Sequence, residues 1–173
     1  PVAGNASAPS RAAMMRAGQT LRGGRLPAIA PREVAREAAP CKEVVLTGDA
    51  IDVTRFAFIQ SNPADAGRYV NTGSVFTWDA ELGRNFGTYR CQIKSPTRLG
   101  VNPEPGQTSW RMLMKMKERG DRSTPISIAL GQDPATWILS TSKLGMGSAD
   151  ELDLVGGIRG RALDVVKSET NGI

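Results

Sequence analysis

Short runs of hydrophobic and β-branched residues, bounded by turn residues, predict a chain built largely from strands. Polar turns are expected at Gly48-Asp49 and over 79–84, where glycine and aspartate favour a tight change of direction. Several short strands separated by such turns indicate sheets rather than a helical bundle. The predicted strands are 43–47, 68–77, 86–93, 125–130, 136–139 and 162–166.

Hydrophobic residues three and four positions apart predict one clear α-helix over 109–119. Trp110, Leu113 and Met114 would share its buried face, and Gly120 would end it. The methionines of this helix are therefore interpreted as core residues rather than as part of a cofactor site. Shorter helices are expected over 11–17, 31–39 and 150–158.

Many strands with few helices predict an α+β or barrel-like fold rather than a doubly wound parallel sheet. The chain has 173 residues, of which 19 are Gly and 11 are Pro. This length suits one domain with an additional N-terminal arm over 1–40. Pro1 at the first position, and the lack of a stop signal in the last residues, lead us to expect a piece of a longer protein.

Composition excludes several classes of site. The chain has no histidine, which excludes a histidine-based nucleophile system, a zincin site and a Cys/His zinc finger within it. Its two cysteines, Cys41 and Cys91, are too few for a disulfide framework, so a reduced, cytoplasmic setting is expected. No apolar run reaches the roughly 20 residues that cross a bilayer, so no membrane partner is expected.

The net charge of +5 is concentrated near the N-terminus. Residues 1–40 hold six arginines against two glutamates, a net of +4, which leaves about +1 for the rest of the chain. The arm carries no aromatic residue that could stack on a base. We therefore interpret it as a connector or an intersubunit surface and expect no nucleic-acid partner.

The first candidate for chemistry is the segment 85–90, Asn-Phe-Gly-Thr-Tyr-Arg. Alternation along a strand would place Asn85, Gly87 and Tyr89 on one face, and Gly87 would let the backbone approach a ligand closely. Arg90 would point the other way unless a bulge intervenes. On the pattern alone, a hairpin strand with a solvated arginine is the favoured interpretation.

The second candidate is the polar segment 140–151, which combines hydroxyls, Lys143 and glycines in a way that could hold a phosphate. It lacks the Gly-Lys-Ser/Thr pattern of a Walker loop. The alternative is a polar loop in which Ser148 and Glu151 form a helix capping box. The pattern alone favours this alternative.

Taken together and in order, these motifs resemble the UbiD family of prenylated-FMN-dependent decarboxylases. The matching segments are 40–55, 85–90, 125–134, 156–160 and 165–170. The resemblance implies a split β-barrel flavin-binding domain over 41–173, with 1–40 forming the end of a preceding α/β domain. It also implies nonoxidative decarboxylation, or the reverse carboxylation, of aromatic or α,β-unsaturated acids. The alternative is a non-catalytic, FMN-binding split-barrel module.

The resemblance also implies roles for individual residues. Arg90 would hold the substrate carboxylate, while Asn85 and Glu151 would bind Mn2+ or Mg2+ at the phosphate of prenylated FMN. K+ would lie at the Phe86 carbonyl and around Ser140, Thr141 and Lys143. Besides Asn85 and Glu151, the cofactor contacts would come from Gly87, Thr88, Tyr89, Arg90, Gln107, Thr141, Ser142, Lys143 and Leu144.

Two departures from the family pattern stand out. Thr108 takes the position that commonly holds a histidine metal ligand, and the acidic proton donors of the family follow the stretch that ends at Glu169. The chain alone is therefore expected to lack the proton donor and to be inactive. Expected partners are a flavin prenyltransferase that supplies the cofactor, and either further copies of the chain or a second chain that carries the acids.

Overall fold

The computed structural model describes residues 27–142 and 150–173, which fall into two compact units. The central unit comprises residues 44–131. The terminal unit combines the described residues of 27–43 with those of 132–172, so its two segments come from opposite ends of the chain. The division expected from the sequence, an arm over 1–40 and a domain over 41–173, stays a prediction.

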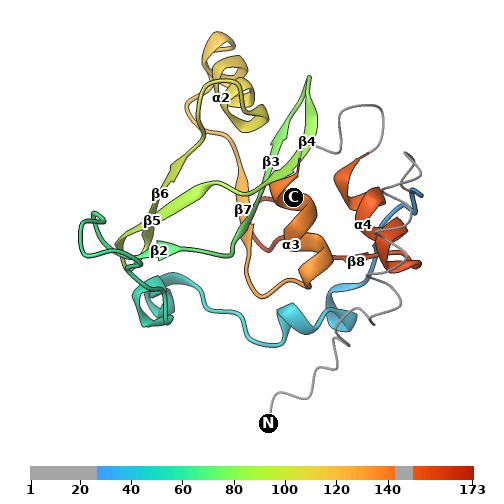
Figure 1. Cartoon of the computed structure of the whole chain (residues 1–173), viewed down its shortest axis with the longest axis horizontal. Coiled ribbons are helices and arrows are strands. Elements are labelled where there is room, and N and C mark those ends of the chain that lie inside the picture. Colours follow the sequence, from blue (N-terminus) through green and yellow to red (C-terminus); the bar gives the residue numbers. More distant parts are fainter. Residues whose placement is uncertain (1–26, 143–149) are drawn as a thin grey trace. The chain divides into compact units, whose positions relative to one another are not determined.

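The central unit contains two three-stranded antiparallel sheets and one α-helix (Figure 1). In the first sheet, β5 (Arg90–Ser95) lies between β2 (Tyr69–Val70) and β6 (Arg98–Asn102). In the second, β3 (Ser74–Asp79) lies between β4 (Gly83–Gly87) and β7 (Ile126–Ala129). The helix α2 spans Thr108–Glu118, and two 3-10 turns, η3 (Gly48–Ala50) and η4 (Val53–Arg55), precede the sheets.

Side chains from both sheets form the core of the central unit. Val75 and Cys91 are fully buried, and they cluster with Val70 and Tyr89. Helix α2 packs against β3 with Ser109, Met112 and Met116 buried, whereas the predicted Trp110, Leu113 and Met114 are only half-buried. That prediction was wrong because the buried stripe begins one residue earlier, at a serine whose hydroxyl has a hydrogen-bond partner in the core.

The predicted single strand 86–93 is two strands in different sheets. Residues 88 and 89 belong to neither strand, and they carry the chain from β4 to β5. Strand β4 pairs with β3, whereas β5 pairs with β2 and β6. Asn85 and Arg90 therefore lie in different sheets, on either side of this switch.

The terminal unit joins a short parallel strand pair to two helices. Strand β1 (Arg32–Glu33) pairs with β8 (Asp164–Val165), and helices α3 (Pro134–Thr141) and α4 (Glu151–Arg159) pack together. The backbone of 27–29 lies directly on α4 where the helix carries Gly156 and Gly157. Two 3-10 turns, η1 (Arg36–Ala38) and η2 (Pro40–Lys42), follow β1.

Other predicted elements also differ from the structure. The predicted strand 136–139 lies within α3, because Asp133 caps the helix by accepting hydrogen bonds from the Ala135 and Thr136 amides. The segment 43–47 forms no strand in the described chain, and Val44 is 75% exposed. The predicted helix 31–39 forms β1 and η1 instead, since pairing with β8 holds its first half extended. The predicted helix 11–17 lies outside the described residues.

The α+β class is confirmed, and helix 109–119, helix 150–158 and the strand near 125–130 lie within one residue of their predicted bounds. Both three-stranded sheets of the described chain are open, so a closed barrel is not present there. None of the helices described is long and apolar enough to cross a membrane.

Candidate functional site

The side-chain amide of Asn85 is buried at the centre of a polar cluster in the central unit. Its Nδ2 donates hydrogen bonds to the hydroxyl oxygens of Ser109 (3.0 Å), Tyr89 (3.1 Å) and Thr77 (3.2 Å). The Tyr89 hydroxyl also accepts a hydrogen bond from the Ser109 backbone amide at 3.3 Å. All four residues are at least nine-tenths buried. The cluster thus joins β3, β4, α2 and the switch segment in one network.

The carbonyl oxygen of this amide is differently placed. Among residues 27–142 and 150–173, Asn85 Oδ1 accepts no hydrogen bond, and it is not one of the fully enclosed polar atoms. An amide oxygen is a ligand that Mg2+, Ca2+ and Mn2+ accept. Asn85 therefore presents a free oxygen ligand on an immobilised side chain.

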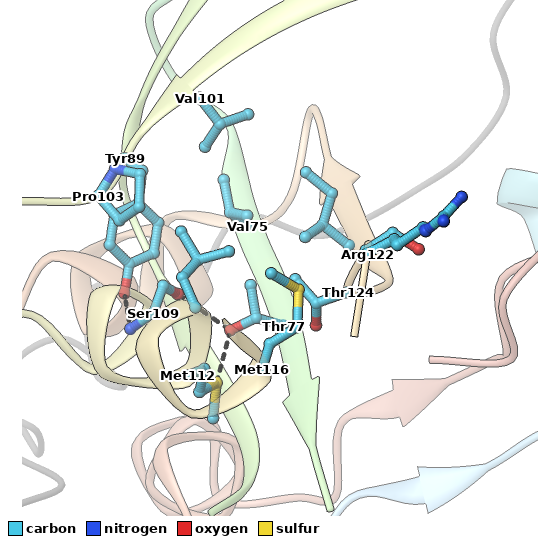
Figure 2. Close-up of a pocket in the computed structure, with 13 residues that line it drawn as sticks. Val75, Thr77, Tyr89, Val101, Pro103, Ser109, Met112, Met116, Arg122 and Thr124 are labelled. Carbon is cyan, nitrogen blue, oxygen red and sulfur yellow. Dashed lines mark hydrogen bonds between the residues drawn. The ribbon is translucent and has the colours of Figure 1, made fainter. Parts of the chain in front are cut away.

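Gly87 and Tyr89 lie on the same side of the chain as Asn85, as the alternation predicts. A Cβ atom at Gly87 would lie 3.0 Å from the Tyr89 ring, so the absence of a side chain lets the ring pack against the backbone. Tyr89 lines an apolar cavity of about 300 Å³ between the sheets and α2 (Figure 2). Its other lining residues include Val75, Val101, Leu113, Met116 and Ile126.

Arg90 begins β5 and lines a second, more polar cavity of about 300 Å³. Its side chain is 74% exposed, and the one ion pair that it makes within the described residues, to Glu104 at 4.0 Å, is too long and too exposed to hold it firmly. The guanidinium is thus available to an anionic ligand. Thr88 and Tyr89 line the same cavity, together with residues that the sequence did not indicate: Ser61, Asp65, Tyr69, Val70 and Asn71.

These additional residues reach Arg90 because β2 pairs with β5, with Tyr69 opposite Gln92 and Val70 opposite Cys91. The side-chain amide of Asn71, the residue after β2, donates to the Ser61 hydroxyl at 3.2 Å, which links it to the segment before that strand. No motif marks them in the sequence, and only the strand register brings them to the cavity.

Gln107 and Thr108 begin α2, next to the Asn85 cluster. Gln107 is the N-cap residue, and its Oε1 accepts a hydrogen bond from the Glu104 amide, which closes the turn before the helix. Thr108 is exposed at the first helical position, immediately before the buried Ser109. A cofactor contact by Gln107 and a metal contact by Thr108 stay predictions.

Ser140, Thr141 and Ser142 lie at the carboxyl end of α3 rather than in a loop. Each hydroxyl donates to a carbonyl three residues earlier, at 2.7 to 3.0 Å. The carboxyl end of a helix carries partial negative charge, which favours a cation over a phosphate. This end is therefore better suited to the predicted K+ than to direct phosphate contacts. Lys143 and Leu144 lie outside the described residues.

Glu151 is the first residue of α4, and the helix is capped by Asp150, whose carboxylate accepts from the Leu152 amide at 2.9 Å. The capping-box interpretation is wrong, because the N-cap lies two residues later than Ser148 and Glu151 is not at the third helical position. No ion pair or hydrogen bond engages the Glu151 carboxylate within the described chain.

The predicted ligands therefore divide between the two units. Asn85 and the Phe86 carbonyl belong to the central unit, whereas Glu151, Ser140 and Thr141 belong to the terminal unit. Among the residues that the structure describes, no three His, Cys, Asp or Glu side chains gather as a metal site. Convergence of Asn85 and Glu151 on one cation stays a prediction.

Comparison with known proteins identifies relatives of the chain. The family model described as "UbiD: 3-octaprenyl-4-hydroxybenzoate carboxy-lyase Rift-related domain" matches residues 32–173. A phenolic acid decarboxylase from Sedimentibacter hydroxybenzoicus is 31% identical over 147 residues, which cover 82% of this chain and 30% of that protein. The chain thus spans about a third or less of the relatives it matches.

Two solved structures share the fold. The closed form of the vanillic acid decarboxylase ShVdcCD from Sedimentibacter hydroxybenzoicus has a TM-score of 0.79 at 31% identity, covering 88% of this chain and 33% of that one. An evolved dimeric form of the UbiD-class enzyme HmfF from Pelotomaculum thermopropionicum, in complex with prFMN, has a TM-score of 0.77 at 27% identity, covering 92% of this chain and 36% of that one. The chain belongs to the UbiD family.

Proposed function

We propose that the chain is the cofactor-binding part of a nonoxidative decarboxylase, or reversible carboxylase, for aromatic or α,β-unsaturated carboxylic acids. The observation that carries the proposal is the buried Asn85 amide, which has an unpaired oxygen five residues before an exposed arginine at a cavity. Family membership supports the reaction class, since the relative and both structures above are named as decarboxylases or UbiD-class enzymes.

The donor set suits a divalent cation that neutralises a phosphate. Asn85 and Glu151 offer oxygen atoms, which Mg2+ and Mn2+ accept, and neither oxygen group is engaged elsewhere in the described chain. Asn85 and Glu151 would hold the cation, Gly87, Thr88, Tyr89 and Gln107 would contact the flavin, and Ser140 and Thr141 would hold K+. When bound, prenylated FMN supplies the electron sink for loss of CO2.

Arg90 is proposed to orient the substrate. Its planar guanidinium can donate two parallel hydrogen bonds to a carboxylate, which fixes both the position and the rotation of that group. Ser61 and Asn71 line the same cavity and would contact the part of the acid beyond the carboxylate. In this arrangement the protein contributes binding and orientation at the bond that breaks.

A second chain is a proposed partner. The open-form structure of the vanillic acid decarboxylase is named as containing a truncated ShVdcD, which supports a companion polypeptide, and the HmfF structure is named as dimeric. We also propose a flavin prenyltransferase as the supplier of the cofactor and a cytoplasmic location.

Coexpression with a flavin prenyltransferase tests the proposal. The purified protein should carry prenylated FMN, identified by absorbance and by the mass of the released cofactor. Asn85→Ala should reduce cofactor retention at least tenfold, as expected on loss of a metal ligand, whereas Arg90→Ala should retain the cofactor and lose substrate binding. Ordinary FMN alone would favour a non-catalytic flavin module, and no flavin at all would overturn both functions.

A further inference from the structure

A directed chain of hydrogen bonds lies beneath Asn85. Asn85 Nδ2 donates to Ser109 Oγ and Thr77 Oγ1, and these two hydroxyl oxygens are 3.0 Å apart. Thr77 Oγ1 in turn donates to Met112 Sδ at 3.2 Å. Figure 2 shows the contacts of Thr77 with Ser109 and Met112. All four residues are buried and come from β3, β4 and α2.

Met112 sets the direction of this chain. A thioether sulfur carries no proton and can only accept, so the 3.2 Å contact between Thr77 and Met112 is a hydrogen bond only when the Thr77 hydroxyl donates its single proton to the sulfur. The Thr77 oxygen must then accept from its other neighbours, Ser109 and Asn85. The hydrogen bonds are therefore all donated in one direction, from the Asn85 amide through the Ser109 and Thr77 hydroxyls to Met112 Sδ.

This direction determines which end of the Asn85 amide faces inward. With the NH2 group inward, its protons meet hydroxyl oxygens that accept them. With the amide reversed, Asn85 Oδ1 would face the oxygens of Thr77 and Ser109, whose protons are directed at Met112 and at Thr77, and only the Tyr89 hydroxyl could donate to it. A buried polar pair without a proton between them is unfavourable. Oδ1 is consequently directed away from the cluster.

We propose that Thr77, Ser109 and Met112 are positioning residues that aim Asn85 Oδ1 at the divalent cation. This inference rests on the proposed function, in which Asn85 is a metal ligand. Groups that orient a ligand typically change metal affinity 10- to 100-fold when removed. The three residues touch neither cation nor substrate in this proposal, and they act only through the orientation of the amide.

Manganese binding by the purified protein in the presence of FMN, followed by Mn2+ electron paramagnetic resonance, tests the proposal without measuring activity. Thr77→Val and Ser109→Ala should each weaken Mn2+ binding about tenfold or more. Met112→Leu, which keeps the volume but removes the acceptor, should weaken it as well. Thr124→Val is the matched control, because Thr124 lines the apolar cavity that Thr77 and Ser109 also line, but within the described chain its hydroxyl bonds only to the Trp78 carbonyl. This variant should change affinity less than twofold.

Nitrogen-15 NMR of the Asn85 side-chain amide gives a second readout that needs no metal. Its protons should exchange slowly with solvent in the wild type and faster in Thr77→Val and Ser109→Ala. If Asn85→Ala abolishes Mn2+ binding while the Thr77, Ser109 and Met112 variants match the control, the positioning role is overturned and the metal site stands. If Asn85→Ala binds Mn2+ as the wild type does, the metal site is overturned and the positioning role with it.

Discussion

At the scale of single residues, Arg90 and Cys91 are neighbours in β5 with opposite surroundings. Arg90 is solvated, whereas the Cys91 side chain is fully buried among Val70, Val75 and Tyr89. Burial raises the pKa of the Cys91 thiol to about 11, because the thiolate loses its hydration. The strand thus presents a charge to one cavity and an inert thiol to the core.

Alkylation should distinguish the two cysteines. At pH 8, iodoacetamide should modify Cys41, which is exposed, and leave Cys91 unmodified over the same time. Peptide mass spectrometry measures the modified fraction of each site, and repeating the reaction in denaturant supplies the control in which both react. Equal modification of the two cysteines in the native protein would contradict the buried position of Cys91.

At the scale of elements, helix α2 is held against the β3–β4 hairpin by ion pairs as well as by the packing of its methionines. The buried Asp79 carboxylate accepts hydrogen bonds from Arg119 Nη2 at 2.6 Å and from the Glu81 and Leu82 amides. Arg119 also pairs with Glu81, and Lys115 of α2 adds a further ion pair to Glu81 at 3.1 Å. The hydrogen bond from Arg119 is the main cause of the lowered pKa of Asp79.

Asp79→Asn should lower the melting temperature by several degrees at pH 7. A carboxyl group whose pKa is lowered by folding stabilises the protein above its unfolded pKa of about 3.9, and this contribution is lost as pH falls through the lower folded value. The difference between wild type and variant should therefore shrink below pH 4. Thermal unfolding followed by circular dichroism at pH 7 and pH 3 measures it.

Asp121→Asn is the matched control for this prediction. Asp121 pairs with the same arginine at 3.1 Å, but its side chain is 51% exposed, and exposed ion pairs contribute little. If Asp121→Asn lowers the melting temperature as much as Asp79→Asn does, then the stabilisation by the Arg119–Asp79 ion pair does not depend on burial of the Asp79 carboxylate.

Elements were predictable where local pattern and tertiary environment agree. The bounds of helix α2 and strand β7 agree with their predicted ranges to within one residue, and Gly120 adopts the left-handed conformation, with φ of 80°, expected after a helix. Residues 136–139 are β-prone by composition, yet Asp133 and Pro134 start a helix there. Capping outweighs the preference of a few side chains, and reading Asp-Pro as a helix start would have corrected the prediction.

The sequence predicted which neighbouring positions of the candidate site lie together, but not the contacts between distant parts of the chain. Alternation places Asn85 with Tyr89, and the resemblance supplies Arg90 and Glu151. Ser109 reaches Asn85 from 24 positions away, and Thr77 reaches Ser109 from 32. Such contacts follow from strand register and helix packing, which no local pattern encodes.

At the scale of the whole molecule, the terminal unit depends on close contact between its two segments. In α4, a Cβ atom at Gly157 would lie 1.6 Å from the Pro27 carbonyl oxygen, and one at Gly156 would lie 2.2 Å from that of Ile29. The Ile29 amide donates to the Asp153 carbonyl at 2.9 Å. Both contacts involve backbone atoms, which cannot move aside as a flexible side chain can.

Gly157→Ala should detach the segment 27–34 from α4 and β8. Alanine favours a helix by about 1 kcal/mol over glycine, but the side chain cannot fit unless the segment moves. The amides of Arg32 and Val34, which donate to Leu163 and Val165 carbonyls, should then exchange faster with deuterium. Gly100→Ala is the control, since its Cβ would meet only the mobile end of Lys94. Unchanged protection at Arg32 and Val34 would refute the prediction.

The pairing of β1 with β8 has a consequence for biosynthesis. Arg32 and its partner Asp164 are 132 positions apart, and a ribosome that adds about 5–20 residues per second needs on the order of ten seconds to make the intervening polypeptide. Until β8 has been synthesised, the backbone groups of β1 have no partner strand, although β1 has already left the exit tunnel. Translation speed and chaperone access during this delay should therefore govern the yield of correctly assembled protein more than they would for a unit made from one continuous stretch.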